Sequence, residues 1–301
     1  MHPLIQKWLA PLAALAFCGA ALAAEPLPVV ASFSILGDLV RVVGSDRVAV
    51  TSLVGPDEDA HVFEPKPSDA KTILQSKLLV TNGLGFEPWA QKLARSAGYK
   101  GLTVAAAKGV KPRAMAGEKD AHGHASVDPH AWQDPTNTIL YVRNISAALS
   151  QLDPAGAAGF KANTDAYVKQ LEDLDAWAKA QIAQLPQDKR KIITSHDAFG
   201  YFAAHYGLVF LAPQGVSTDA EPSARDVAAL IRQIKREKIK AVFFENMSSP
   251  KLLDQLSKDA GVKLGAELYA DALSKPGEPG ATYLGMMRHN IAQITAGMQQ
   301  N

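Results

Sequence analysis

The sequence contains a single cysteine, Cys18, among its 301 residues. One cysteine cannot close a disulfide within the chain, so disulfides are excluded as a source of stability. Cys18 lies in an apolar stretch, Leu9–Leu22, that follows Lys7, which is the pattern of a secretory signal peptide. Cleavage near Ala23 or Ala24 would leave a chain without cysteine. Any site for a soft metal ion would then have to be built from histidine.

A lipid anchor on Cys18 is not expected from the local sequence. Phe17 directly precedes the cysteine, whereas lipoprotein signals carry Gly, Ala or Ser at that position. We therefore predict that a signal peptide over 1–24 is removed and that the exported protein is periplasmic. After this segment the sequence has no apolar run of the roughly 20 residues that a membrane-spanning helix needs.

Neither sign of charge is in excess. The 31 Lys and Arg nearly balance the 30 Asp and Glu, which gives a formal net charge of +1. This balance argues against nucleic acid and anionic membrane surfaces as partners. Hydrophobic residues make up 47% of the chain, enough for one large core or two medium ones.

Apolar runs typical of strands alternate with amphipathic segments in both halves of the chain. Strands are predicted near 29–32, 48–53, 77–81, 191–194, 241–244 and 265–268. Helices are predicted near 36–43, 68–75, 89–96, 198–205, 224–237 and 250–260. This alternation is typical of βα units that form mainly parallel sheets.

Two longer helices are predicted between the halves. Asp134 and Pro135 have the pattern of an N-cap and a first helical residue, and they open a helix to about Leu152. A second helix, over about 155–185, would be roughly 40 Å long at 1.5 Å per residue. We therefore expect an α/β fold of two lobes, each a mainly parallel sheet with flanking helices, joined by one long rigid helix. The predicted boundaries are 25–153 for the N-terminal lobe, 154–186 for the linking helix and 187–301 for the C-terminal lobe.

The segment Lys108–Val127 is predicted to be a mobile surface loop, because it is poor in large apolar residues. It contains His122 and His124. Two histidines in a flexible loop are not held in place for a metal ion, so we interpret them as part of a solvated loop rather than a metal site.

Four polar side chains occupy loops at which ligands commonly bind. His61, His196 and Asp271 each follow a predicted strand, and His130 precedes the helix that opens at residue 135. Because the loops at the carboxyl ends of parallel strands converge, these four side chains could meet. Three imidazoles and one carboxylate suit Zn²⁺, whereas Mn²⁺ prefers more oxygen ligands.

Each of these residues also has an ordinary interpretation. A loop histidine is more often a surface or capping residue, and Asp271 alone is more often a turn former. We interpret His205 as a residue at a helix C-terminus that favours the helix dipole, and His289 as part of the polar face of the last helix. Spacing alone leaves a shared metal site and these ordinary roles both open.

Four short segments around the candidate residues occur together in one protein family. They are Asp-x-His-x-Phe-Glu-Pro at His61, Asp-Pro-His-x-Trp-x-Asp-Pro at His130, His-Asp-Ala-Phe-Gly-Tyr at His196 and Glu-Leu-Tyr-x-Asp-x-Leu at Asp271. With these segments in this order, nearly the whole chain after residue 24 resembles the zinc and manganese solute-binding proteins of ABC importers, the ZnuA/TroA-like or cluster A-I family.

The resemblance implies a monomeric binding protein, not an enzyme. It implies two α/β lobes with the metal ion between them, held by His61, His130, His196 and Asp271. A membrane permease of an ABC importer would accept the ion, and a periplasmic metallochaperone is a further expected partner. Manganese and iron members of the family typically carry Glu at the third ligand position, where this chain has His196, so Zn²⁺ is the predicted cargo.

Two alternatives follow from the same residues. The first keeps the transport role and changes the cargo to Mn²⁺ or Fe²⁺. The second is a zinc hydrolase, in which three ligands leave a place for water and Glu58, Asp59 or Asp197 acts as general base. The His-Glu-x-x-His pattern of many zinc hydrolases does not occur in the sequence.

Overall fold

The N-terminal lobe is built on a four-stranded parallel sheet in the order β2-β1-β3-β4. This computed structural model describes residues 25–119 and 125–301, so the predicted signal peptide and both His122 and His124 lie outside the described residues. The strands are β1 (Leu27–Phe33), β2 (Val48–Val54), β3 (Leu78–Thr81) and β4 (Leu102–Ala105). The helices that connect or flank them are α1 (Ser34–Gly44), α2 (Pro67–Gln75) and α3 (Pro88–Ala97).

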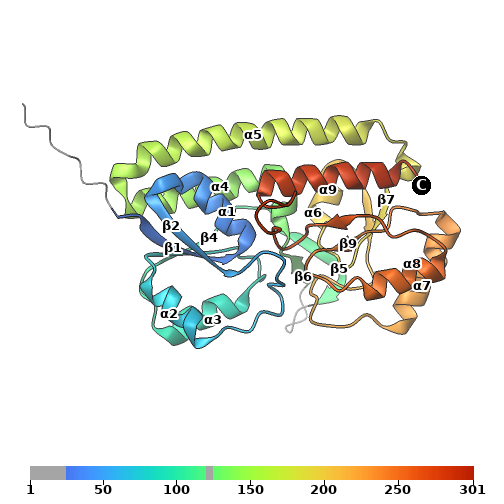
Figure 1. Cartoon of the computed structure of the whole chain (residues 1–301), viewed down its shortest axis with the longest axis horizontal. Coiled ribbons are helices and arrows are strands. Elements are labelled where there is room, and N and C mark those ends of the chain that lie inside the picture. Colours follow the sequence, from blue (N-terminus) through green and yellow to red (C-terminus); the bar gives the residue numbers. More distant parts are fainter. Residues whose placement is uncertain (1–24, 120–124) are drawn as a thin grey trace, which may run out of the picture.

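The C-terminal lobe repeats the parallel design with shorter strands (Figure 1). The strands pair in parallel as β7 (Lys191–Ile193) with β8 (Val209–Leu211) and β9 (Phe244–Glu245) with β10 (Glu267–Leu268). A single parallel bridge between Ile193 and Val242 joins the two pairs. The helices are α6 (Gly200–Tyr206), α7 (Ala224–Glu237), α8 (Lys251–Ala260) and α9 (Tyr283–Met298). The predicted α/β fold with parallel sheets and flanking helices is confirmed.

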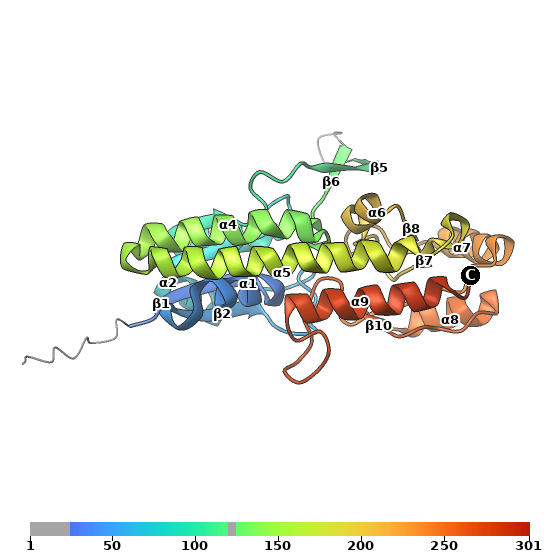
Figure 2. The ribbon, with the colours of Figure 1, turned by 90° about the horizontal axis from the view of Figure 1, so that it is seen from above.

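Helix α5 (Ala157–Ala183) runs along both lobes (Figures 1 and 2). It packs against α1 and α4 (Pro135–Leu152) at one end and against α9 at the other. Helix α4 begins as the sequence predicts, because the Asp134 side chain accepts a hydrogen bond from the Thr136 N–H at 2.8 Å and Pro135 occupies the first helical position. Within the described residues, no helix is both long and apolar enough to cross a membrane.

One apolar core extends through both lobes. It joins residues of the N-terminal sheet and α1 to residues of α5 and the C-terminal lobe, among them Phe33, Leu36, Phe160, Leu171, Tyr269 and Met287. All six side chains are buried. A second, smaller core lies between α7, α8 and β7. The largest apolar cluster is therefore continuous across the two lobes.

The prediction of a loop over Lys108–Val127 is wrong for its two ends. They form an antiparallel pair, β5 (Arg113–Lys119) with β6 (Ala125–Asp128), in register from Arg113 opposite Asp128. Strand ladders are made by backbone groups, which every residue except proline supplies in full. The Ala, Gly, Glu and Lys of this segment have low strand propensity, so side-chain preferences do not indicate the hairpin.

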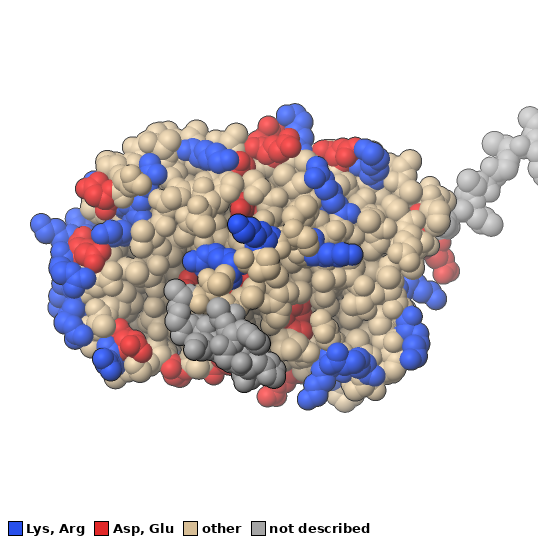
Figure 3. Space-filling view, turned by 180° about the vertical axis from the view of Figure 1, so that it is seen from behind, with Lys and Arg blue, Asp and Glu red and all other residues tan. Residues whose placement is uncertain are grey.

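Charged side chains of both signs are spread over the face shown in Figure 3. A group of Lys and Arg gathers at the end of the C-terminal lobe, where α7 contributes exposed Arg232, Lys235 and Arg236. The nearly even charge balance of the whole chain does not reveal this local group.

His205 connects three helices. It lies in the last turn of α6, as the sequence suggested, and its two ring nitrogens reach Asp134 at 3.2 Å and Asp175 on α5 at 2.7 Å. The hydrogen bond to Asp134 raises the pKa of His205 more than partial burial lowers it, and Asp175 raises it further. Lys179 also pairs with Asp175, at 2.6 Å.

We expect His205→Gln to destabilise the protein more at pH 6 than at pH 9. A histidine whose pKa is raised by folding contributes stability that is fully present below the unfolded pKa of about 6.5 and is lost as the pH rises through the folded pKa. Because the ring is partly exposed, the expected loss at pH 6 is about 1 kcal/mol or less. Urea unfolding of both proteins at the two pH values measures it. A difference that does not change with pH would rule out this role.

Candidate metal centre

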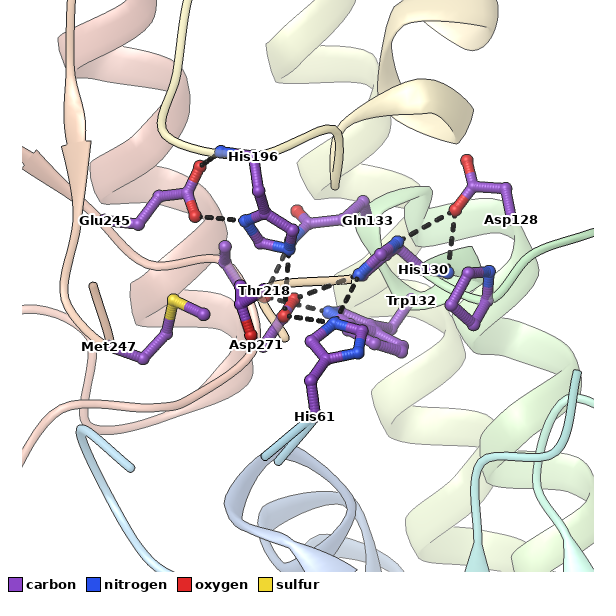
Figure 4. A network of polar contacts seen from close by, with 12 residues as sticks. His61, Asp128, His130, Trp132, Gln133, His196, Thr218, Glu245, Met247 and Asp271 are labelled. Carbon is purple, nitrogen blue, oxygen red and sulfur yellow. Dashed lines mark hydrogen bonds and ion pairs between the residues drawn. The ribbon is translucent and has the colours of Figure 1, made fainter. Parts of the chain in front are cut away.

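Four side chains from distant parts of the chain converge between the lobes. His61, His130, His196 and Asp271 each offer one ligand atom, and these atoms all lie within 4.8 Å of one another. The Nε2 atom of His61 lies 3.3 Å from Nε2 of His130, and the Nε2 atoms of His61 and His196 each lie 3.1 Å from Oδ2 of Asp271 (Figure 4). The structure thus brings together all four residues that the sequence analysis selected.

Loops at the ends of strands and helices carry these side chains. His61 follows β2, His196 follows β7 and Asp271 follows β10, so all three lie beyond the carboxyl ends of parallel strands. His130 immediately precedes the short 3-10 helix η2 (Ala131–Gln133), which leads into α4. The parallel sheets of both lobes therefore direct their ligand loops toward the same point.

Buried carboxylates orient two of the imidazoles. Oδ1 of Asp128 lies 2.9 Å from Nδ1 of His130 and also accepts a hydrogen bond from the His130 backbone N–H at 3.0 Å. Glu245 binds Nδ1 of His196 with one oxygen, and its other oxygen accepts the backbone N–H groups of Ser195 and His196 at 3.0 and 3.1 Å. Because an ionised carboxylate only accepts, each Nδ1 is the donor, and Nε2 of each neutral ring is left with its lone pair facing the centre.

Asp128 and Glu245 were not among the functional residues predicted from the sequence. Asp128 precedes His130 by two residues, a spacing that allows a carboxylate to reach both the main chain and the ring. Glu245 lies at the end of the apolar run 241–244, which is the same position relative to a strand that selected the other candidates. A polar residue directly after a predicted strand was therefore present in the sequence at Glu245, although it was not chosen as a candidate.

The centre is closed to water on most sides. The side chains of His130, His196 and Asp271 are fully buried, and the His61 side chain is 5% exposed. Among the described residues, Nε2 of His196 and both carboxylate oxygens of Asp271 are buried and form no hydrogen bond of suitable geometry, although His196 Nε2 and Asp271 Oδ2 lie 3.1 Å apart. Leaving such polar atoms unpaired in a protein interior is unfavourable unless another group binds them. Three imidazole nitrogens and a carboxylate that face one point fit a divalent cation.

Electrostatic interactions within the cluster shift its pKa values. Burial raises the pKa of Asp271, but His130 and His196 lower it more, so it lies well below its ordinary value. Burial lowers the pKa of His130, whereas Asp271 and Asp128 together raise it to about 9. The pKa of His196 is likewise raised, by Glu245 and Asp271 acting against burial. The centre therefore favours positive charge, which protons or a metal ion can supply.

Aromatic side chains close the centre on the side of the N-terminal lobe. Phe33, Phe86 and Trp132 are buried and contact one another with ring centroids 4.8 to 5.1 Å apart. The indole Nε1 of Trp132 donates to the carbonyl of Ala270 at 3.0 Å. The same carbonyl accepts from Nε2 of Gln133 at 2.7 Å. These bonds tie the His130 loop directly to the loop of Asp271.

Two of the three carboxylates considered as a general base, Glu58 and Asp59, have structural partners in this fold. Glu58 accepts a hydrogen bond from the Gly55 N–H at 2.7 Å. Asp59 accepts the His61 N–H at 2.9 Å and the hydroxyl of Thr218 at 2.7 Å. Neither belongs to the group of four converging ligand atoms, and neither does Asp197. This arrangement gives no support to the hydrolase alternative.

The fold and this cluster are typical of a two-lobed protein that binds a metal ion. The family model described as "Zinc-uptake complex component A periplasmic" matches residues 29–297. The manganese-binding lipoprotein MntA of Bacillus subtilis is 33% identical over 282 residues, which cover 91% of this chain and 90% of MntA. A protein of the same name from Halalkalibacterium halodurans is 32% identical over 276 residues, which cover 92% of this chain and 90% of that protein.

Solved structures show the same likeness. The periplasmic zinc-binding protein TroA from Treponema pallidum superposes with a TM-score of 0.84 at 30% identity, and the match covers 91% of this chain and 99% of TroA. The manganese-bound periplasmic metal-binding protein from Candidatus Liberibacter asiaticus superposes with a TM-score of 0.80 at 29% identity, covering 90% and 99%.

The chain belongs to the ZnuA/TroA-like family, the metal-binding solute-binding proteins of ABC importers. Members of this family are binding proteins, and this chain is a binding protein rather than an enzyme. Several relatives are named lipoproteins, which disagrees with the expectation that Cys18 carries no lipid. Cys18 itself lies outside the described residues.

Proposed function

We propose that this protein captures one Zn²⁺ ion between its lobes and delivers it to the membrane permease of an ABC importer. His61, His130, His196 and Asp271 are the proposed ligands. The observation that carries the proposal is the orientation of two imidazoles by Asp128 and Glu245, which directs their Nε2 atoms toward the buried, unpaired carboxylate of Asp271. Carboxylate–histidine pairs of this kind hold metal ligands in place.

The donor set favours zinc over manganese. Three nitrogens and one carboxylate are a common four-coordinate set for Zn²⁺, and affinity at nitrogen ligands follows an order in which Zn²⁺ exceeds Mn²⁺ and Fe²⁺. His196 supplies a third nitrogen where manganese members of the family typically carry Glu. The relatives named above include manganese-binding proteins as well as a zinc-binding one, so Mn²⁺ or Fe²⁺ is the alternative cargo.

Four protein ligands would leave the ion without an open position for water, which suits storage and transfer rather than hydrolysis.

We further propose that the protein is a monomer. Its lobes would cover residues 25–153 and 187–301, and residues 154–186 would join them. The protein would be located in the periplasm after removal of residues 1–24. Acylation of Cys18 is the alternative that the relatives' names support. A periplasmic metallochaperone is a proposed donor of the ion.

Elemental analysis of protein purified without added metal tests the cargo. We expect about one zinc ion per chain, and we expect a hundred-fold excess of Mn²⁺ over the chain to leave that zinc in place, because nitrogen-rich sites prefer zinc. Manganese or iron retained at one ion per chain would establish the alternative. Chelator-sensitive activity on ester, peptide or phosphate substrates would contradict the binding-protein role.

The mass of the same purified protein distinguishes a signal peptide cleaved near Ala23 from a chain that carries a lipid on Cys18.

A further inference from the structure

Asp59 links a proposed zinc ligand to the opposite lobe. One oxygen of its carboxylate accepts the backbone N–H of His61 at 2.9 Å, so Asp59 fixes the loop that carries this ligand. The other oxygen accepts the hydroxyl of Thr218 at 2.7 Å. Thr218 belongs to the segment 212–223 between β8 and α7, in the C-terminal lobe. A single side-chain hydrogen bond therefore connects the His61 loop to that segment.

The segment of Thr218 is in turn attached to the loop of His196. The backbone N–H of Gln214 donates to the carbonyl of Ser195 at 3.3 Å, and the N–H of Asp197 donates to the carbonyl of Gly215 at 3.0 Å. Ser195 and Asp197 are the two neighbours of His196 in the chain. Asp59 and Thr218 thus complete a chain of contacts between two ligand loops of opposite lobes.

A cavity of about 340 Å³ adjoins this contact, and both Asp59 and Thr218 line it together with Ser195 and Met247. Figure 4 shows Thr218 and Met247 on the opposite side of the four ligands from Trp132. The cavity is lined mainly by polar side chains, among them Asp59, two residues before His61, and Ser195, the residue directly before His196. His61 is the ligand with the most exposed side chain, at 5%, whereas the side chains of the other three are fully buried.

Other contacts between the lobes would be harder to open. Toward Trp132 the centre is closed by buried aromatic rings and by the two hydrogen bonds to the Ala270 carbonyl. At Asp57 the lobes are joined by a backbone hydrogen bond to Leu273 at 2.9 Å and by a side-chain bond to Asn246 at 2.8 Å. The Asp59–Thr218 contact consists of one hydroxyl and one carboxylate oxygen, both on partly exposed residues.

We propose that Asp59 and Thr218 are the positioning residues that control metal exchange, and that the ion enters and leaves through the adjoining cavity. This inference rests on the proposed metal-binding function. While the contact is formed, Asp59 holds His61 in place and the segment 212–223 covers the centre. When it opens, the His61 loop loses its tie to that segment, and the ligand with the greatest exposure can leave the ion first.

The experiment measures the rate at which zinc leaves the full-length mature protein after mixing with excess chelator. Thr218→Val keeps the shape of the side chain and removes the hydroxyl. We expect this variant to release zinc about ten-fold faster, because it loses one hydrogen bond to a charged group. The association rate should change less, by about three-fold at most, because the four ligands are intact. Thr218→Ser retains the hydroxyl and should restore slow release.

The matched control is Thr72→Val on α2, which removes a hydroxyl bonded only to the Ser68 carbonyl of its own helix. Asp59→Ala is a second variant in case Thr218→Val folds poorly, and adding Thr218→Val to it should change the release rate little, because the contact is already broken. Hydrogen exchange of residues 55–65 in the metal-free protein should be faster in Thr218→Val than in Thr72→Val.

Three results would overturn the inference. They are a release rate in Thr218→Val equal to that of Thr72→Val, equally fast release from Thr218→Ser, and unchanged exchange over 55–65. Each of these leaves the proposed function intact if the wild-type chain binds zinc. A wild-type chain that binds no metal would overturn the proposed function and this inference together.

Discussion

Replacing His196 by alanine is expected to lower zinc affinity by at least about a hundred-fold, while His205→Ala leaves the affinity unchanged. Removing a residue that only hydrogen-bonds to a metal ligand typically lowers metal affinity by up to about a hundred-fold. Removing the ligand itself should lower the affinity by more. Both histidines follow β7, nine residues apart, but only His196 faces Asp271. Competition with a chelator at pH 7.5 measures both affinities.

The His196 variant also leaves Glu245 buried without its ring partner. Glu245 is fully buried, and its remaining partners are the two backbone N–H groups of residues 195 and 196. Removing one member of a buried charged pair is destabilising, so the melting temperature of the metal-free variant must be measured beside its affinity. If His196→Ala and His205→Ala lose equal affinity while both remain folded, the proposed ligand set is wrong.

Zinc binding at pH 7.5 is expected to release at least one proton per ion. In the metal-free protein the pKa of His130 is raised to about 9 by Asp271 and Asp128, so its ring carries a second proton at this pH; Glu245 and Asp271 raise the pKa of His196 in the same direction. Coordination by Nε2 requires that proton to leave. Since a bound proton competes with the ion, affinity should rise with pH up to about 9 and should fall at least about ten-fold per pH unit below it.

Calorimetric titration in several buffers of different ionisation enthalpy, all at pH 7.5, counts the released protons. Unperturbed imidazoles would place the loss of affinity below about pH 6.5, so the onset near pH 9 is specific to the charges around this centre. The matching test is the affinity measured from pH 9 to 5.5. An affinity that stays flat between pH 7.5 and 5.5 would exclude histidine as a ligand.

The sequence predicted the parts of the molecule that periodicity and capping determine. The alternation of strands and helices placed β1, β2 and β3 and most helices within a few residues of their observed bounds. Asp134 and Pro135 marked the start of α4 correctly, because an N-cap and a first-turn proline act locally. The four candidate ligands were selected by their position after strands and by the family motifs, and the structure places them together.

Features that depend on tertiary contacts could not be predicted in this way. The pairing of β5 with β6 involves backbone groups of a segment with weak strand propensity. The pairing of Glu245 with His196 depends on a contact formed in three dimensions, because the two residues are 49 positions apart, whereas Asp128 reaches His130 over two residues and could have been selected from local spacing. The contact between Asp59 and Thr218 spans 159 residues, and no local pattern indicates which threonine would meet the carboxylate.

The apolar core shared by the two lobes limits how such a protein can be re-engineered. The C-terminal lobe has a small core between α7, α8 and β7, but side chains of α5 and α9 pack in the same large cluster as those of the N-terminal sheet, so separating the halves would divide that cluster. Grafting one half onto the other half of a relative would create mismatched surfaces along the whole of α5, even if all four ligands were retained. A functional chimera of two family members would have to exchange the packing faces of these helices together with the ligand loops.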